Sequence, residues 1–283
     1  MLNGIILGII AMLCYGVQEI FLKKILPRLG TYTTTLYREL VIVILIVLYA
    51  ALSGEPFVFT LEILGWMILL GILGTFAVLS FFAAIKIGKV SIVSPIAHAS
   101  TVITVLLAAI FYHEQLTHFQ GFAVLLIILG TIIASFRWKD LKNLKLHEVT
   151  KGVPFAVITF FLWGVVFFLM KIPIKLSGIL VPSILLDGFI FLILASAVPW
   201  KGLRKPTKKE IWLIILVGFL SAIGTLTFNY AYTLELISLI APIVYSSPFI
   251  TVILAHIYLK EVMEMHQYVG VIGIIVGVVL LAL

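Results

Sequence analysis

Three ionisable side chains stand inside the first two long apolar runs of the chain: Glu19, Arg38 and Glu39. Charged groups are costly in apolar surroundings, so their presence favours a water-lined path, a partner of opposite charge, or both. We predict that these residues gate or couple the passage of a solute at one mouth of such a path. The alternative is structural: Glu19 pairs with Lys23 one turn later, and Arg38 extends towards the polar interface.

A similar set of charges recurs later in the chain, where Lys171 directly follows one apolar run and Asp187 stands inside the next. They again provide one cation and one carboxylate. We therefore expect Lys171 and Asp187 to pair as a second gate at the opposite mouth, closed when the first is open.

Two prolines precede another pair of candidate residues, since His98 and Tyr245 each follow a proline, Pro95 or Pro242, by three positions. A proline removes a backbone donor and can expose carbonyl groups to a cavity. His98 could therefore hydrogen-bond a substrate or carry a proton. In the alternative, His98 is a buried neutral side chain bonded to a nearby hydroxyl such as that of Thr101.

Amphipathic and polar side chains supply the remaining binding candidates. The rings of Tyr15 and Trp163 could pack on a substrate, and Asn229 could orient it through hydrogen bonds. Polar groups of this kind also tie transmembrane helices together, which is the alternative for each. Two further carboxylates, Glu114 and Glu261, stand at segment ends, where they are expected to bond the N-terminal amides of the following helix.

The sequence lacks the motifs that are typical of nucleotide binding, metal binding and enzymatic catalysis. The sequence has no glycine-rich loop before Lys-Ser or Lys-Thr, no H-E-x-x-H pair, scattered histidines and a single cysteine, Cys14. We therefore expect no bound cofactor, no metal site and no enzymatic activity. The net charge of +7 is expected to report membrane topology rather than nucleic-acid binding.

Composition identifies the elements that must position these residues. Of the 283 residues, 63% are apolar and only 11% are charged, and the mean hydropathy is +1.27. These values exclude a water-soluble globule. Ten apolar runs are long enough to be transmembrane helices, because backbone groups in lipid must bond within their own segment. The runs cover residues 4–22, 33–52, 63–85, 91–112, 119–136, 152–170, 180–198, 211–232, 237–258 and 267–283.

The chain also repeats itself at long range. An offset of 147 superposes Pro95 on Pro242 and Thr104 on Thr251, and an offset of 148 aligns other segments. Because five helices is an odd number, the second copy must enter the membrane in the opposite sense. We predict an all-α integral membrane protein of two inverted five-helix repeats, residues 1–136 and 152–283, joined by a basic linker at 137–151.

Lysine and arginine predict the orientation, because they are retained in the cytoplasm more readily than they are translocated. The odd-numbered connections hold 16 of them and the even-numbered connections hold two. We therefore expect a multi-pass protein of the cell membrane, with basic cytoplasmic loops and both termini outside.

The repeated residues resemble a known family. The proline-containing fourth helix, the closing Y-H-E-Q-L and L-K-E-V-M, and the Tyr15-Gly16 and Trp163-Gly164 pairs are similar to the EamA repeat of the drug/metabolite transporter superfamily. Lys23, Lys171 and Arg38 fit the same pattern. The resemblance implies a ten-helix exporter or exchanger driven by gradients.

The sequence thus predicts a secondary active transporter that exports or exchanges a small metabolite, such as an amino acid, by alternating access. An exchanger of nucleotide sugars or sugar phosphates is one alternative, and a lipid-handling or structural membrane partner is another. The expected partners are a small-molecule substrate and the lipid bilayer, with a coupling proton as a further candidate. The chain is expected to act as a monomer or homodimer.

Overall fold

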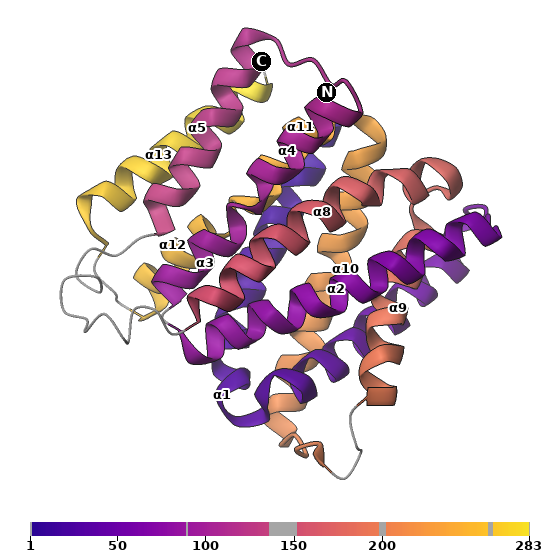
Figure 1. Ribbon diagram of the computed structural model, residues 1–283. Helices are drawn as coiled ribbons and strands as arrows, with labels where there is room; N and C mark the ends of the chain where they lie inside the picture. Colours follow the sequence, from indigo (N-terminus) through magenta and orange to yellow (C-terminus); the bar gives the residue numbers. More distant parts are fainter. Residues whose placement is uncertain (1, 89, 136–151, 198–201, 260–262, 283) are drawn as a thin grey trace.

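The computed structural model describes residues 2–88, 90–135, 152–197, 202–259 and 263–282, and every regular element in these ranges is a helix (Figure 1). The first half contains α1 (Leu2–Ser53), α2 (Leu61–Ile87), α3 (Val90–His98), α4 (Ser100–Phe111) and α5 (His118–Ser135). The second contains α8 (Val153–Ser177), α9 (Leu180–Ala197), α10 (Lys208–Leu234), α11 (Ile237–Tyr245), α12 (Pro248–Leu259) and α13 (Met265–Ala282). The linker predicted at 137–151 lies outside the described residues.

The label α1 covers two helices, 52 residues in all, that meet at Gly30, where φ is 79° and ψ is 170°. They contain the two runs expected at 4–22 and 33–52, and the helical residues extend through the connection expected between them. A straight helix of this length would extend about 80 Å, far beyond the ~30 Å hydrocarbon core. Glycine accepts this backbone conformation without the steric cost of a side chain. The break therefore turns α1 back on itself, as Figure 1 shows.

Two predicted helices are each divided. The run at 91–112 becomes α3 and α4, separated at Ala99, and the run at 237–258 becomes α11 and α12, separated at Ser246 and Ser247. Each division comes directly after the candidate site residue that lies three positions beyond a proline. His98 ends α3 and Tyr245 ends α11.

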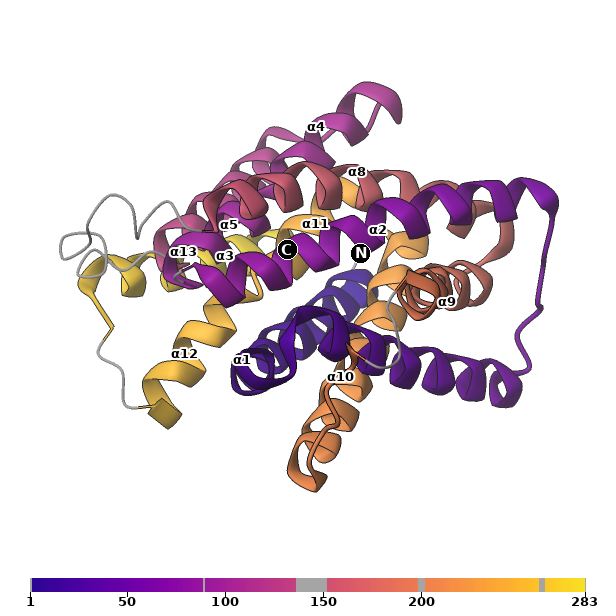
Figure 2. The same cartoon turned by 60° about the horizontal axis from the view of Figure 1, so that its bottom comes forward.

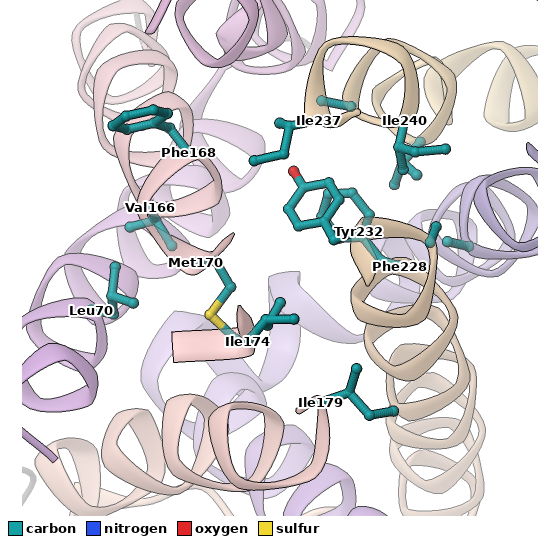
Figure 3. Packing of buried hydrophobic residues seen from close by; sticks show 14 of the residues in the cluster. Leu70, Val166, Phe168, Met170, Ile174, Ile179, Phe228, Tyr232, Ile237 and Ile240 are labelled. Atoms are coloured by element: carbon teal, nitrogen blue, oxygen red, sulfur yellow. The ribbon is translucent and has the colours of Figure 1, made fainter. Parts of the chain in front are cut away.

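Helices of the first half pack against helices of the second half. Helix α1 lies along α10, α2 along α8, and α5 along α13. Figure 2 shows α9 end-on, between α2 and the second arm of α1. Buried side chains from α2, α8, α10 and α11 belong to one core, in which Met170, Ile174 and Tyr232 lie between the Leu70 side and the Ile240 side (Figure 3).

Contacts made by equivalent residues of the two repeats are themselves equivalent. Thr251 Oγ1 donates to the carbonyl oxygen of Gly16 at 3.0 Å, and Thr104 Oγ1 donates to that of Gly164 at 3.1 Å. In each case a glycine of one half contacts the broken helix of the other half. The repeat seen in the sequence therefore corresponds to a reciprocal packing of the halves.

The connections gather at two ends of the bundle. At one end Arg28 forms an ion pair with Glu210 at the start of α10. At the other end Tyr230 donates a hydrogen bond to Glu55, in the connection before α2. Residues near the two chain termini, Ile5 and Leu281, share a small core (Figure 1 marks the ends). The turn of α1 thus meets the start of α10, and the connection before α2 meets the part of α10 near its end.

Seven helices are long and apolar enough to cross a membrane, by length and composition, within the described residues. They are α1, α2, α8, α9, α10, the α11–α12 region at Ile237–Leu254 and α13. Two shorter apolar helices cover Ile96–Phe111 and His118–Ala134. Many outward-facing side chains on these helices are large and apolar, including those of Phe76, Leu106 and Trp212. The chain is therefore a multi-pass membrane protein.

Candidate substrate cavity

A cavity of about 140 Å³ lies between the two halves of the chain. Residues from α1, α2 and α3 line it together with residues from α8, α9, α10 and α11. Its polar lining includes Arg38, three carboxylates, His98 and the amide of Gln18, and the rest is mostly aromatic or aliphatic. A concave site with a few convergent polar groups on an apolar wall is typical of small-molecule binding.

Arg38 is the centre of one polar group in the cavity. Its Nη1 donates to Oε1 of Glu39, and its Nε donates to Ser221 Oγ at 3.0 Å. Ser221 also hydrogen-bonds to Gln18. The guanidinium is thus held by groups from α1 and α10, and its side chain remains 14% exposed.

Asp187 on α9 completes this group. Its carboxyl lines the same cavity as Arg38 and Glu39, and one oxygen of each of the two carboxyls, Oδ2 of Asp187 and Oε2 of Glu39, has no hydrogen-bond partner among the described residues. Glu39 is fully buried and Asp187 is 6% exposed. Two carboxylates that face one small cavity repel each other, so a positive partner such as Arg38 stabilises them.

A second polar pair joins Glu19 to His98. Nε2 of His98 lies 3.1 Å from Oε1 of Glu19, while Nδ1 lies 2.9 Å from the carbonyl oxygen of Ser94. Nδ1 also lies 3.3 Å from the Ser94 hydroxyl, so a neutral His98 can accept from this hydroxyl at Nδ1 and donate to Glu19 through Nε2. Thr251 Oγ1 donates to the other Glu19 oxygen at 3.2 Å.

Aromatic rings form the apolar wall around these groups. The ring centroids of Phe81 and Trp163 are 4.5 Å apart, and those of Phe167 and Tyr245 are 4.8 Å apart. The hydroxyl of Tyr15 lies 3.4 Å from Thr225 Oγ1. Such rings can bind apolar groups, and their faces can also attract the positive charge of an organic cation.

The structure brings eight of the ten predicted site residues to this cavity. They are Tyr15, Glu19, Arg38, Glu39, His98, Trp163, Asp187 and Tyr245. Asn229 instead donates to Ser183 Oγ at 2.7 Å and ties α10 to α9, which was the alternative for it. Lys171 also lies elsewhere.

The structure differs from one predicted pairing and from the partners named in two of the alternatives. Lys171 forms an ion pair with Glu114 rather than with Asp187, and Asp187 lines the same cavity as Glu39, so the two expected gates meet in part at one site. Glu19 pairs with His98 rather than with Lys23. His98 bonds to Ser94 on its own helix rather than to Thr101. The partner of Lys171 comes from the other half because the halves interleave, whereas the partners of Glu19 and His98 lie within the first half.

Several lining residues had no signal strong enough to single them out. Gln18 and Ser221 each supply one polar group among many in apolar segments, and Phe81, Phe82 and Phe167 belong to a chain with 20 phenylalanines. Only the repeat could have helped, because it predicts that polar positions of both halves converge.

Comparisons with known proteins agree with this architecture. The EamA-like transporter family matches residues 2–136 and again residues 150–283. The chain belongs to the EamA-like transporter family. It is therefore a member of the drug/metabolite transporter superfamily.

Two individual proteins resemble this EamA-like chain. An uncharacterised protein of Methanocaldococcus jannaschii, MJ1333.1, is 31% identical over 94 residues, which are 33% of this chain and 69% of that protein. A solved crystal structure matches with a TM-score of 0.75 and 14% identity over 98% of this chain and 96% of its own. At 14% identity, the likeness to the solved crystal structure shows a shared fold alone.

At one end of this EamA-like fold, Glu114 joins the two halves. Its carboxylate accepts hydrogen bonds from Lys171 Nζ at 2.6 Å and from the backbone amides of Ile237 and Ser238 at 3.2 and 2.9 Å. It therefore caps the N-terminus of α11, not that of the following helix as expected. A carboxylate is favoured there by the helix dipole. Glu261 lies outside the described residues.

Glu114 predicts a pH-dependent contribution to stability. Burial raises its pKa, but the hydrogen bonds from Lys171 and Ser238 outweigh this and lower the pKa below its ordinary value. A carboxyl with a lowered native pKa stabilises the fold above its unfolded pKa of about 4.3, and the contribution disappears as pH falls through the native pKa. Glu114→Gln should lower the free energy of unfolding by about 1–3 kcal/mol at pH 7.

Chemical unfolding in detergent at a series of pH values measures this effect. The difference between the wild type and Glu114→Gln should shrink as the pH falls below about 4. Glu62→Gln, on an exposed residue of the first turn of α2, is the control and should differ little from the wild type. An equal deficit for Glu114→Gln at pH 3 and pH 7 would contradict the ionic role.

Proposed function

We propose that this chain is a secondary transporter that moves a small amphipathic metabolite carrying an ammonium group, such as an apolar amino acid or an amine. The observation that carries the proposal is the central cavity, in which both halves place carboxyl groups and aromatic rings around Arg38. Membership in the EamA-like transporter family supports a transport function, without indicating the substrate. The substrate class rests on the chemistry of the cavity.

The charges of the cavity favour an ammonium group over an anion. Among the described lining residues, Glu19, Glu39 and Asp187 are carboxyls and Arg38 is the one permanent cation. An ammonium group can donate to the Glu39–Asp187 pair, and the rings of Trp163 and its neighbours can hold an apolar side chain. Arg38 can orient a substrate carboxylate where one is present.

The same charges weigh against the first alternative. A nucleotide sugar or sugar phosphate carries negative phosphate groups, which prefer several lysines or arginines. The described lining offers Arg38 alone, and Glu39 already engages it. A lipid-handling role would not explain the three buried carboxyl groups, because lipid tails require only apolar walls.

Alternating access is the mechanism we propose. Ten crossings follow if each arm of α1 and each divided helix, α3–α4 and α11–α12, crosses the membrane once. The reciprocal contacts of Gly16 and Gly164 support two repeats that exchange roles around the cavity. We propose that the two repeats are inverted, with the basic connections cytoplasmic and both termini outside.

Uptake into proteoliposomes tests the function. Vesicles preloaded with unlabelled L-phenylalanine should take up labelled L-phenylalanine, and 2-phenylethylamine should compete because it retains the ammonium group. The matched acid, 3-phenylpropanoate, lacks that group and should not compete. Glucose 6-phosphate represents the phosphate alternative. Competition by the acid or by glucose 6-phosphate, with none by the amine, would overturn the proposed substrate class.

A further inference from the structure

We propose that the turn of α1 and the start of α10 bind the headgroup of an anionic phospholipid, such as phosphatidylglycerol, at one edge of the membrane. The inference concerns the outer surface of the chain rather than the central cavity, and it does not depend on the proposed function. It assigns a lipid partner of stated charge to a defined place on the fold.

Positive side chains from three elements gather at this place. They are exposed lysines and arginines of the α1 turn, the end of α2 and the start of α10, here called the basic patch: Lys24, Arg28, Lys86, Arg204, Lys205, Lys208 and Lys209. In the same three stretches of sequence, 23–33, 84–88 and 202–212, Glu210 is the one carboxylate. The basic patch therefore has a large excess of positive charge.

Printed contacts join the two halves of the chain within the basic patch. Arg28 of the α1 turn pairs with Glu210 of α10, and its Nη2 donates to the carbonyl oxygen of Lys205 at 3.3 Å. In return, Arg204 donates to the carbonyl oxygen of Arg28. The turn of α1 thus lies beside the start of α10, as Figure 1 also shows, and their cations share one surface.

Several charges of the basic patch are left without a partner. Nζ of Lys86 lies 4.0 Å from the place that a β-carbon would take at Gly30, so the end of α2 adds its charge to the α1 turn. The side chains of Lys205, Lys208 and Lys209 make no hydrogen bond or ion pair with another described residue. Like charges held close together repel each other, so an anion bound among them is stabilising.

A row of exposed apolar side chains continues along α10 from the lysines. Trp212 follows Lys208 by four positions and Lys209 by three, which places it on the same face of the helix. Ile215 and Phe219 extend this face at the same spacing, and the three side chains are 73%, 41% and 48% exposed. A tryptophan between cations and an apolar stripe is typical of the membrane interface.

This arrangement fits a phospholipid better than a soluble anion. The phosphate of a lipid headgroup can accept from the lysines while its acyl chain lies along Trp212, Ile215 and Phe219. Inorganic phosphate would use the cations alone. Each lysine or arginine near the membrane surface strengthens the binding of an anionic lipid by about fivefold.

A headgroup bound here would contact both halves of the chain. Lys86 and the α1 turn belong to the first half, whereas Lys205, Lys208 and Lys209 belong to the second. A negative group between them attracts both sets and holds this end of the bundle together. Binding of the anionic lipid should therefore stabilise the folded protein.

Fluorescence quenching by brominated lipids tests the lipid site. The full chain is placed in phosphatidylcholine vesicles that contain an equal, small fraction of either brominated phosphatidylglycerol or brominated phosphatidylcholine. The signal of Trp212 is the difference between the wild type and Trp212→Phe. With two lysines at about fivefold each, phosphatidylglycerol should be preferred at Trp212 by about 25-fold. Equal quenching by the two lipids would overturn the proposal and leave the charges as a topology signal alone.

Charge variants test the assigned residues. Lys209→Gln should lower the preference about fivefold, and the double variant Lys208→Gln with Lys209→Gln should nearly abolish it. Lys175→Gln, on an exposed lysine in the last turn of α8, is the control and should leave the preference unchanged. Full preference in the double variant would overturn the role of these two lysines.

Thermal unfolding in a non-ionic detergent distinguishes a lipid from a soluble anion. Added phosphatidylglycerol should raise the melting temperature by about 3 °C or more. The same concentration of phosphatidylcholine or of inorganic phosphate should leave it unchanged. An equal rise with inorganic phosphate would overturn the lipid in favour of a soluble anion, and no rise with phosphatidylglycerol would overturn the link between the halves.

Discussion

Arg38→Gln should reduce transport about 100-fold or more and lower the stability of the protein, because it removes the single guanidinium beside two buried carboxyl groups. Removing one partner of a buried ionic group typically costs about 3–5 kcal/mol, since the other charge is left uncompensated. Counterflow in proteoliposomes and chemical unfolding in detergent measure the two effects.

Arg38→Lys is the matched control for charge. It keeps one cation but loses the planar fork that donates to both Glu39 and Ser221, so an intermediate loss is expected. The double variant Arg38→Glu with Glu39→Arg should recover part of the transport that Arg38→Glu alone loses. Full transport by Arg38→Glu would contradict the role assigned to this residue.

Gly16→Ala and Gly164→Ala should each destabilise the protein by about 1–3 kcal/mol, because an added methyl group overpacks a helix crossing. At Gly16 the new carbon would lie 2.5 Å from Ile250 Cβ and 2.7 Å from the carbonyl oxygen of Ser247. At Gly164 it would lie 2.6 Å from Ile103 Cβ. Backbone atoms cannot move aside as the end of a flexible side chain can.

Thermal unfolding in detergent measures the effect of these glycine changes. Gly65→Ala is the control, since nothing lies within 4 Å of a methyl group added there. It should leave the melting temperature unchanged or raise it slightly, because alanine favours a helix over glycine. A melting temperature for Gly16→Ala equal to that of Gly65→Ala would show that Gly16 is not closely packed against Ile250 and Ser247.

The membrane class and the repeat could be predicted from the sequence because both depend on local patterns. Long apolar runs require helices in lipid, and equivalent residues such as Thr104 and Thr251 recur at one spacing. The structure shows the same two threonines making equivalent contacts with glycines of the opposite half. The residues expected at the cavity were found because a charge within an apolar run has few alternatives.

Pairing could not be predicted in the same way. A single sequence shows which side chains need partners, but the partner depends on how distant helices pack. Asp187 lines one cavity with Glu39, and Lys171 contacts Glu114, because the second half interleaves with the first. The continuity of α1 through residues 23–29 was missed for a related reason: basic residues near a span end resemble a loop, whereas a helix can extend beyond the membrane.

In the proposed mechanism, one cavity opens alternately to the two sides of the membrane. Thr225 lines it, and Thr225→Cys in a Cys14→Ser background places the sole thiol there. A membrane-impermeant maleimide should label this cysteine in right-side-out vesicles and also in inside-out vesicles, and L-phenylalanine should slow labelling from both sides. Labelling from one side only, under every condition of substrate and pH, would contradict alternating access through this cavity.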